Sequence, residues 1–243
     1  MSASTGFLSK TAALTLKDMR IEMRGRDTLP PMIAFAITVT LLLAFAAPDS
    51  GELSEPVTLP LGTVAFTDVT AAFFWITVLF AGLIGFGRTF EVERNEGAID
   101  SMLLVPVDRS GLFLSKATAN LGFVAIVQLF LLPLFALLFH FELGTGWLTL
   151  ALIVGLVDVG FVALGTLFAS VAAHTRSREL VLPILALPAL VPLFIAAFEL
   201  TSDLLGGDGL EAVASRGWFG ILLAFDVIFG IAAALTFEFV IDA

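Results

Sequence analysis

The sequence RTFEVERNEGAIDSMLLVPVDRSGLFLSK (residues 88–116) is the longest charged stretch in a chain that is otherwise mostly apolar. It lies between two hydrophobic runs and holds four basic and five acidic residues. A short apolar set within it, from Ala98 to Leu104, is followed by Val105 and Pro106. Because proline lacks a backbone N–H and disfavours helix at the residue before it, the pattern predicts a short amphipathic helix that ends near Leu104. We expect this helix to lie at a membrane face, where a partner can reach it.

The composition places the rest of the chain in a membrane. Of the 243 residues, 58% are hydrophobic and only 14% are charged, with a mean hydropathy of +1.03. A soluble domain carries nearer to a quarter charged residues. About 20 apolar residues are needed to cross the roughly 30 Å of hydrocarbon in a bilayer. Six runs meet this length: 29–47, 69–87, 119–141, 147–173, 180–198 and 218–240. We therefore predict an all-α polytopic membrane protein with six transmembrane helices.

The first 28 residues are too polar to span and form a segment of their own ahead of the transmembrane domain at 29–243. Apolar residues recur in it at steps of three and four, which predicts one face of a helix. They are Leu8, Ala12, Leu16, Met19 and Met23. Lys17, Arg20 and Arg24 lie mostly off that face, as in a basic amphipathic helix that rests on an anionic lipid surface. The alternative is a solvated helix packed on the protein's own surface.

The distribution of basic residues predicts the orientation. With six spans, one side receives both termini, residues 88–116 and the loop at 174–179, and eleven of the twelve Lys and Arg residues fall on that side. The other side holds only Arg216 together with nine acidic residues. Cytoplasmic segments of membrane proteins carry the excess of Lys and Arg. Both termini and the central charged loop are therefore expected in the cytoplasm.

The sequence lacks the motifs of several enzyme classes. There is no G-x-x-x-x-G-K-[ST] motif for ATP, no H-E-x-x-H, and no cysteine for a disulfide, a thiolate metal site or a nucleophile. Only two histidines are present, so a Ser-His-Asp site cannot be assigned. The net charge of −10 argues against a nucleic-acid partner. We expect no catalytic residue, no metal site and no cofactor bound by this chain.

Three ionisable residues at or near membrane depth are candidates for function. Asp158 and Asp226 would each cost about 2.5–3.5 kcal/mol on insertion scales. They either mark a substrate or proton path, or are carboxylic acids hydrogen-bonded to Ser, Thr or a backbone carbonyl. His140, at the outer end of the third run, could ligate a haem iron, or it is simply an interfacial polar residue.

Two of the apolar runs have features of their own. The fourth contains Gly155, Gly160 and Gly165, small residues that allow helices to approach closely. The fifth contains three prolines at 183, 188 and 192, each of which removes a backbone hydrogen bond. We expect the fifth helix to be kinked or broken, and to be followed by short interfacial pieces before residue 218.

An amphipathic N-terminal helix, six spans and a charged loop after the second span together resemble the permease subunits of ABC-2-type exporters. In that architecture the helix of the loop docks into a cleft of the ATPase subunit and is called the coupling helix. More specifically, LKDMRIEMR at 16–24, FEVERNEGAIDSMLLVPVDR at 90–109 and LSK at 114–116 resemble the CcmB family, the permease subunit of the cytochrome c maturation system. The resemblance covers essentially the whole chain, and its specific part is residues 88–116.

The resemblance implies that the charged loop couples this chain to an ATPase. Acidic and basic residues would form the rim of the contact, apolar ones its buried anchors, and Gly97 a bend. The residues concerned are Glu91, Glu93, Arg94, Glu96, Gly97, Ile99, Asp100, Met102, Leu103, Pro106, Asp108 and Arg109. The alternative is an ordinary loop tucked under the bundle.

The resemblance also implies a set of partners in a bacterial inner membrane. They are a P-loop ATPase (A-type) that binds ATP and Mg²⁺, a haem-handling membrane subunit (C-type), a small single-span subunit (D-type), and a haem chaperone outside the cytoplasm. Haem would then be bound at the level of the complex, and membrane lipids would contact the N-terminal helix. Other readings of the sequence are an ABC-2 permease for a lipid, polymer or drug, a proton-coupled transporter that uses Asp158 and Asp226, and a scaffold without ATP dependence.

Overall fold

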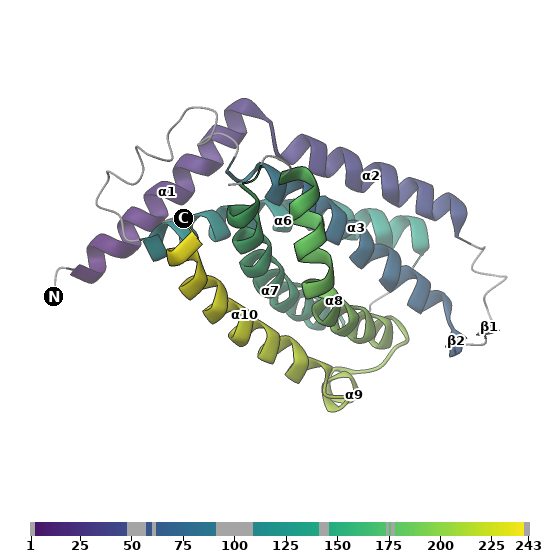
Figure 1. Ribbon diagram of the computed structural model, residues 1–243. Coiled ribbons are helices and arrows are strands. Elements are labelled where there is room, and N and C mark those ends of the chain that lie inside the picture. Colours follow the sequence, from purple (N-terminus) through teal and green to yellow (C-terminus); the bar gives the residue numbers. More distant parts are fainter. Residues whose placement is uncertain are drawn as a thin grey trace.

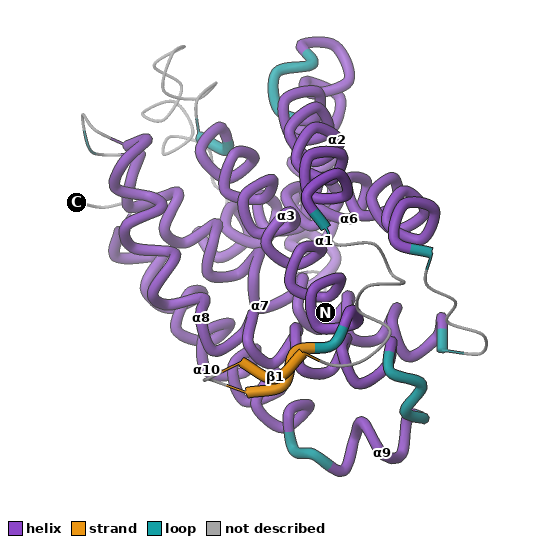
Figure 2. The backbone as a smooth tube through the Cα atoms, turned by 90° about the vertical axis from the view of Figure 1, so that its right-hand side faces the viewer, coloured by secondary structure: helices purple, strands orange, loops and turns teal. Residues whose placement is uncertain are grey.

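The computed structural model describes residues 3–47, 57–59, 62–90, 109–140, 146–173, 175 and 178–240, and eight helices lie in these ranges. The helices are α1 (Ala3–Gly25), α2 (Leu29–Ala46), α3 (Phe66–Arg88), α6 (Arg109–Phe139), α7 (Trp147–Ala173), α8 (Arg178–Leu205), α9 (Leu210–Ser215) and α10 (Trp218–Val240). Six of them are long and apolar enough to cross a membrane, which confirms the predicted polytopic all-α class. Two three-residue strands, β1 (Val57–Leu59) and β2 (Gly62–Val64), pair antiparallel ahead of α3 and were not predicted (Figure 2).

Most helix bounds match the apolar runs, and two do not. Helix α6 begins at Arg109, ten residues before the predicted span, so residues 109–116 are its first turns and not part of a loop. Their mixed polarity hid them, because a helix can continue beyond the bilayer into water. Helix α8 runs without a break from Arg178 to Leu205 with all three prolines inside it. A break at these prolines was therefore a wrong expectation, although the ribbon of α8 changes direction along its length (Figure 1).

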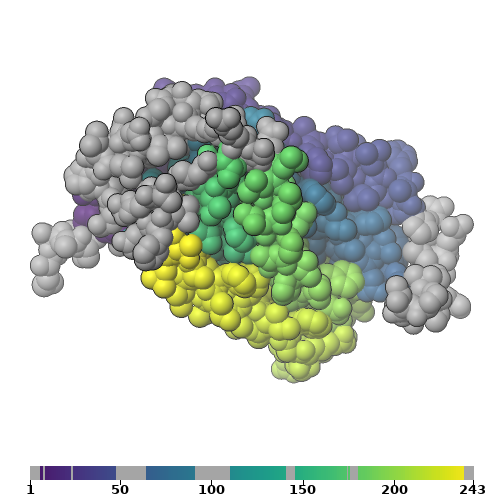
Figure 3. All heavy atoms as spheres, viewed as in Figure 1, coloured from purple at the N-terminus to yellow at the C-terminus, as the bar shows by residue number. Residues whose placement is uncertain are grey.

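The spans are unequally buried. Helices α3 and α7 are the most enclosed, whereas α2 and α10 bury the smallest share of their residues. In Figure 1, α2 and α10 lie along opposite edges of the bundle, with α7 and α8 between them. The space-filling view shows the same order, with α8 between α2 and α10 on the visible face (Figure 3). Within the described residues, the peripheral helix α2 makes extensive contacts with α3 and α6 only.

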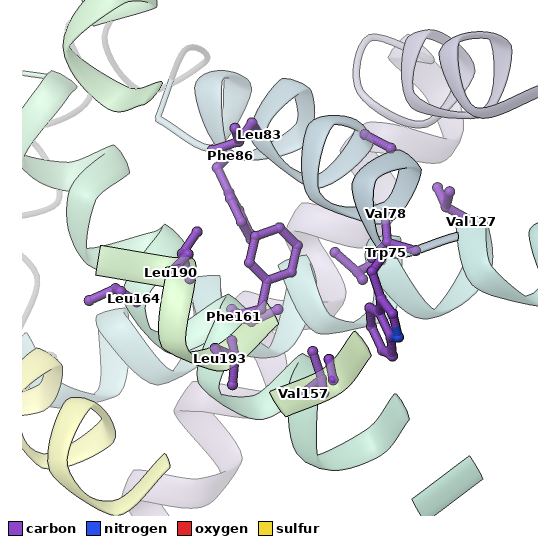
Figure 4. Packing of buried hydrophobic residues seen from close by; sticks show 14 of the residues in the cluster. Trp75, Val78, Leu83, Phe86, Val127, Val157, Phe161, Leu164, Leu190 and Leu193 are labelled. Atoms are coloured by element: carbon purple, nitrogen blue, oxygen red, sulfur yellow. The ribbon is translucent and has the colours of Figure 1, made fainter. Parts of the chain in front are cut away.

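Two aromatic rings lie against glycines where α3 meets α7. A Cβ on Gly82 of α3 would collide with the ring of Phe161, and a Cβ on Gly165 of α7 would collide with the ring of Phe86. The two rings contact each other edge to face, with centroids 4.9 Å apart (Figure 4). This interlock depends on residues without a side chain, because packing at this density leaves no room for a further methyl group.

The helix ends gather at two opposite ends of the bundle. At one end, which we call the inner end, Phe237 of α10 contacts Phe113 of α6 and Phe90, with ring centroids 5.0 and 6.4 Å apart. At the other, the outer end, Phe66 of α3 contacts Phe139 of α6 at 6.3 Å. Both the N-terminal helix α1 and the C-terminal end of α10 lie toward the inner end (Figure 1). The assignment of this end to the cytoplasm stays a prediction from the basic residues.

Candidate coupling site at the inner end

The side of α1 that packs along α6 contains several polar side chains. Thr11 and Glu22 are buried, and Thr15 donates a hydrogen bond from Oγ1 to the carbonyl of Ser115 at 3.3 Å. Leu16 and Ile21 are exposed. Helix α1 therefore buries polar side chains against the protein while it leaves some apolar ones exposed.

The predicted apolar face of the N-terminal helix is only partly exposed in the structure. Met19 does not face outward but packs on α6, where a Cβ on Gly122 would lie 3.3 Å from its methyl carbon. The side chains of Leu8 and Met23 lie outside the described residues. Ala12 and Leu16 are exposed, as are Arg20 and Arg24. Lys17 is half-exposed and its Nζ lies 3.2 Å from Asp18 Oδ1.

Lys116 of α6 forms an ion pair with Asp18 of α1 that is almost enclosed. Its Nζ lies 3.1 Å from Asp18 Oδ2, and the two side chains are only 5% and 10% exposed. Removing one partner of an ion pair that is shielded from water strongly destabilises the folded protein, because the other charge is left buried without compensation. The pair therefore fixes α1 on α6.

Lys116 and Asn120 also hold the residues that open the charged segment. The Lys116 ammonium lies 5.7 Å from the centre of the Phe90 ring, within the range of a cation–π contact. Thr89 Oγ1 and Asn120 Oδ1 are hydrogen-bonded at 3.1 Å, and Asn120 Nδ2 donates to Thr166 Oγ1 of α7 at 2.9 Å. Phe90 directly precedes residues 91–108 and α6 directly follows them, so both ends of that segment are fastened together.

Glu22 caps the start of α2 from the preceding helix. Its carboxylate accepts hydrogen bonds from the backbone N–H of Thr28 at 2.9 and 3.0 Å and of Leu29 at 2.7 Å. The next two residues of α2 are prolines without N–H groups, and Met32 N donates to the carbonyl of Thr28 at 3.3 Å. The first N–H groups of a helix have no partner within it and attract negative charge. Glu22 alone thus satisfies the donors that α2 leaves open.

A small pocket of about 50 Å³ lies where these contacts meet. Its lining surface is mostly apolar but includes several charged and polar side chains. The lining residues are Asp18, Ile21, Glu22, Thr28, Gly85, Arg88, Thr89, Lys116, Ala119, Asn120 and Phe123. We call the set Asp18, Glu22, Thr89, Phe90, Lys116 and Asn120 the junction, because it joins α1, α2, α3 and α6 beside the charged segment.

The residues predicted to contact an ATPase, from Glu91 to Asp108, lie outside the described residues, and so does the side chain of Arg109. Their role stays a prediction. The structure describes instead the junction that carries both ends of the segment. That junction holds the described residues on either side of the segment against α1 and α7.

The two intramembrane aspartates are not brought together. Asp158 is buried and accepts a hydrogen bond from Gln128 Nε2 of α6 at 2.8 Å, an amide partner and not the Ser, Thr or backbone carbonyl named in the structural alternative. Asp226 of α10 lies at Gly160, where a Cβ would collide with its Oδ1. Residues 158 and 160 point about 200° apart around a helix with 3.6 residues per turn. The two carboxylates thus face opposite sides of α7, and a substrate or proton path through them stays a prediction.

His140 is exposed and directly follows α6, with a left-handed φ of 51°. In the described part of the chain, no three His, Cys, Asp or Glu side chains are grouped so that they could hold a metal ion. The outer end carries a different polar cluster. Ser202 of α8 donates to Asp68 Oδ1, and Arg216 pairs with Asp203 Oδ1 and, at 2.6 Å, with Asp208 Oδ2.

Sequence reasoning named Lys116 only as part of a motif and missed the partners of the junction. A signal for α1 was available: Thr11, Thr15, Asp18 and Glu22 recur at steps of four, three and four, the spacing of a polar face turned toward a neighbour. No local sequence pattern predicts the hydrogen bonds between Thr89 and Asn120 or between Gln128 and Asp158. These pairs depend on the register between helices.

Comparison with known proteins gives the chain a family. Residues 9–241 match the family described as CcmB protein. The chain is 27% identical over 199 residues to "Heme exporter protein B" of Rhodobacter capsulatus, covering 82% of this chain and 84% of that protein. It is 26% identical over 190 residues to "Heme exporter protein B" of Paracoccus denitrificans, covering 77% and 80% respectively.

Proposed function

The chain belongs to the CcmB family, and on that basis we propose that it is the membrane-spanning subunit of a haem exporter. The observation that carries the proposal is the match over nearly the whole chain, together with two relatives named "Heme exporter protein B" that align over about four-fifths of their length. The six apolar helices agree with a multi-pass transporter subunit.

Within that function, residues 91–108 serve as the contact with an ATPase. Glu91, Glu93, Arg94 and Glu96 supply charged rim contacts, and an apolar helix that includes Met102 inserts into a groove of the partner, as amphipathic helices do. The enclosed Lys116–Asp18 pair and the Thr89–Asn120 hydrogen bond support this role. A segment that is held at both ends transmits a movement of its partner to the helix bundle, whereas a loop without such contacts would move by itself.

ATP and Mg²⁺ bind to the partner, because this sequence has no P-loop motif. The A-type ATPase acts from the cytoplasm, where the excess of Lys and Arg places the inner end. The C-type and D-type subunits complete the assembly in a bacterial inner membrane. The transport cycle delivers haem to, or releases it from, a chaperone on the outer side. Leu16 and Arg20, both on the exposed side of α1, rest on the lipid surface.

The experiment is a mild-detergent pull-down of the tagged chain from its native membrane, read by mass spectrometry and by the absorbance spectrum of haem. Recovery of a P-loop ATPase and a haem-containing membrane partner is the expected result. An ATPase without haem or a haem partner would contradict haem export and indicate an ABC-2 exporter of another substrate. Absence of any ATPase would overturn the coupling role.

A substitution in the segment tests the contact itself. Met102→Asp places a charge among the proposed apolar anchors, so the purified complex should lose substrate-dependent ATP hydrolysis while the chain still inserts into the membrane. Met102→Leu is the matched control and should keep the wild-type rate. Normal hydrolysis in Met102→Asp at equal subunit amounts would mean that the segment does not dock.

A further inference from the structure

We propose that α1 and the first turns of α6 form one rigid arm, and that Asp18, Lys116 and Glu22 are the positioning residues that make this arm carry motion of residues 91–108 into α2. The proposal deepens the coupling role and rests on it. It assigns to the N-terminal helix a mechanical task in addition to lying on a lipid surface. Three separate features of the structure support it.

The first feature is the closeness of α1 and α6. A Cβ on Gly111 would lie 3.2 Å from the ring of Phe7 and 3.3 Å from Thr11 Oγ1, and a Cβ on Gly122 would lie 3.3 Å from Met19. The two helices run parallel, since contacts at higher residue numbers of α1 fall at higher residue numbers of α6. From Gly111 to Gly122 the shared length is about 16 Å at 1.5 Å per residue. Small residues let the two backbones approach over that whole length.

The second feature is the ion pair at the middle of this contact. Lys116 is held by Asp18 on one side and lies over the Phe90 ring on the other, so a single ammonium group touches α1, α6 and the residue before the segment. Sliding α1 along α6 would separate the enclosed charges and leave each of them without compensation, which is strongly unfavourable. The arm is therefore expected to move as a unit rather than shear.

The third feature is the joint to α2. Only three residues, 26–28, separate α1 from α2, and Arg26 among them has a φ of 57°. Such a short turn would act as a hinge, but the Glu22 carboxylate bridges it by holding the N–H groups of Thr28 and Leu29. Since α2 is among the least buried spans, moving it disturbs the fewest packed side chains. Glu22 thus makes the turn between α1 and α2 rigid, and α2 is one of the least buried spans.

The rigid arm is tested with a disulfide between α1 and α6. The chain has no cysteine, so Thr11→Cys/Gly111→Cys is made in a clean background. The Cβ of residue 111 would lie 3.3 Å from Thr11 Oγ1, the atom whose place the sulfur of Cys at position 11 would take, so the two side chains are close enough to be linked. In the complex, the oxidised and reduced proteins should transport and hydrolyse ATP equally. Loss of transport on oxidation, restored by reduction, would show that α1 slides on α6 and would overturn the proposal. Each single-cysteine variant under the same oxidant is the control.

The positioning role of the ion pair is tested by exchange of charges. Asp18→Lys and Lys116→Asp should each hydrolyse ATP but lose transport per ATP hydrolysed. The double variant should recover part of the loss, because it restores the ion pair but not the contact of an ammonium group with the Phe90 ring. Ala13→Lys, which adds a charge at an exposed position of α1, should leave the ratio unchanged. If the singles fail to insert, recovery of insertion in the double variant still supports the pair. A double variant no better than the singles would contradict it.

The joint is tested by Glu22→Gln with two readouts. In the isolated chain, hydrogen exchange at the amides of Thr28 and Leu29 should accelerate, and unchanged exchange would overturn the role of Glu22 whether or not an ATPase is bound. In the complex, ATP hydrolysis should persist while transport per ATP falls. A wild-type chain that never recruits or stimulates an ATPase would refute the proposed function, and the exchange measurement would still decide the joint.

Discussion

Phe161 of α7 lies with its ring over Gly82 of α3, in the space where any other residue would place its Cβ. One turn further, the partners are exchanged, and Phe86 of α3 lies over Gly165 of α7. The equal spacing of both contacts means that α3 and α7 run parallel in a single register. Because α3 also leads directly to Thr89 and Phe90, this interlock ties the most enclosed part of the bundle to the junction.

Gly165→Ala should destabilise the protein. The added methyl group would overlap the Phe86 ring, and overpacking of this kind costs about 1–3 kcal/mol. Thermal unfolding of the purified chain in detergent measures the loss. Gly155→Ala is the matched control on the same helix, since a Cβ there meets nothing within 4 Å. It should be neutral or stabilising by up to about 1 kcal/mol, because alanine favours helix over glycine. Equal stability of the two variants would contradict the interlock.

Asp158 and Gln128 should behave as a hydrogen-bonded pair. Asp158→Leu leaves the buried Gln128 amide without a partner and should cost about 1–3 kcal/mol, whereas Asp158→Leu/Gln128→Leu should recover part of that loss. Asp158→Asn keeps a polar partner of the same shape and should retain both stability and transport. These values come from thermal unfolding alongside a transport assay. A stable Asp158→Asn variant without transport would instead favour a proton-coupled mechanism.

Arg216→Gln should loosen the outer end without unfolding the protein. The Arg216 side chain is 49% exposed, so its pairs with Asp203 and Asp208 are worth no more than about 1 kcal/mol. The turn at 206–209 between α8 and α9 should then be cut faster by a protease added from outside. Raising the salt concentration should have a similar effect on the wild type through screening. Glu211→Gln, at an exposed acid of α9, should not change the cleavage rate.

Cysteine labelling should establish the orientation. Ser9→Cys on α1 and Ser215→Cys on α9 each add one exposed thiol to a chain that has none. In intact cells an impermeant reagent should label residue 215 from outside, and it should label residue 9 only after permeabilisation. The reverse pattern would show that the distribution of basic residues misled the assignment.

The sequence was informative where a property is local. The number of spans followed from apolar runs, and α7 and α10 begin and end where the hydropathy does. The start of α6 was missed because Ser115, Lys116 and Thr118 read as loop residues, yet on the helix Ser115 and Lys116 turn toward α1. Three prolines did not break α8, since membrane-spanning helices tolerate proline where neighbouring groups satisfy the freed backbone carbonyls.

The contacts of the site were the least predictable part. Glu22 lies six residues before the N–H that it caps, with a turn between, so no motif for helix starts applies to it. Lys116 and Asp18 form an ion pair although two whole spans, α2 and α3, lie between them in the sequence. Such pairings are set by how helices stack, and a single sequence carries no direct record of that.

The inward polarity of α1 bears on the order in which the protein is made. Thr15 and its acceptor at Ser115 are separated by 100 residues, so α1 leaves the ribosome long before the helix that it rests on. Until α6 has been inserted, Asp18 and the side of α1 around it have no protein surface to cover them, and the exposed Leu16 side is the only part ready to engage a bilayer. The N-terminal helix therefore cannot take its final place until the third span has been inserted, although it is made two spans earlier.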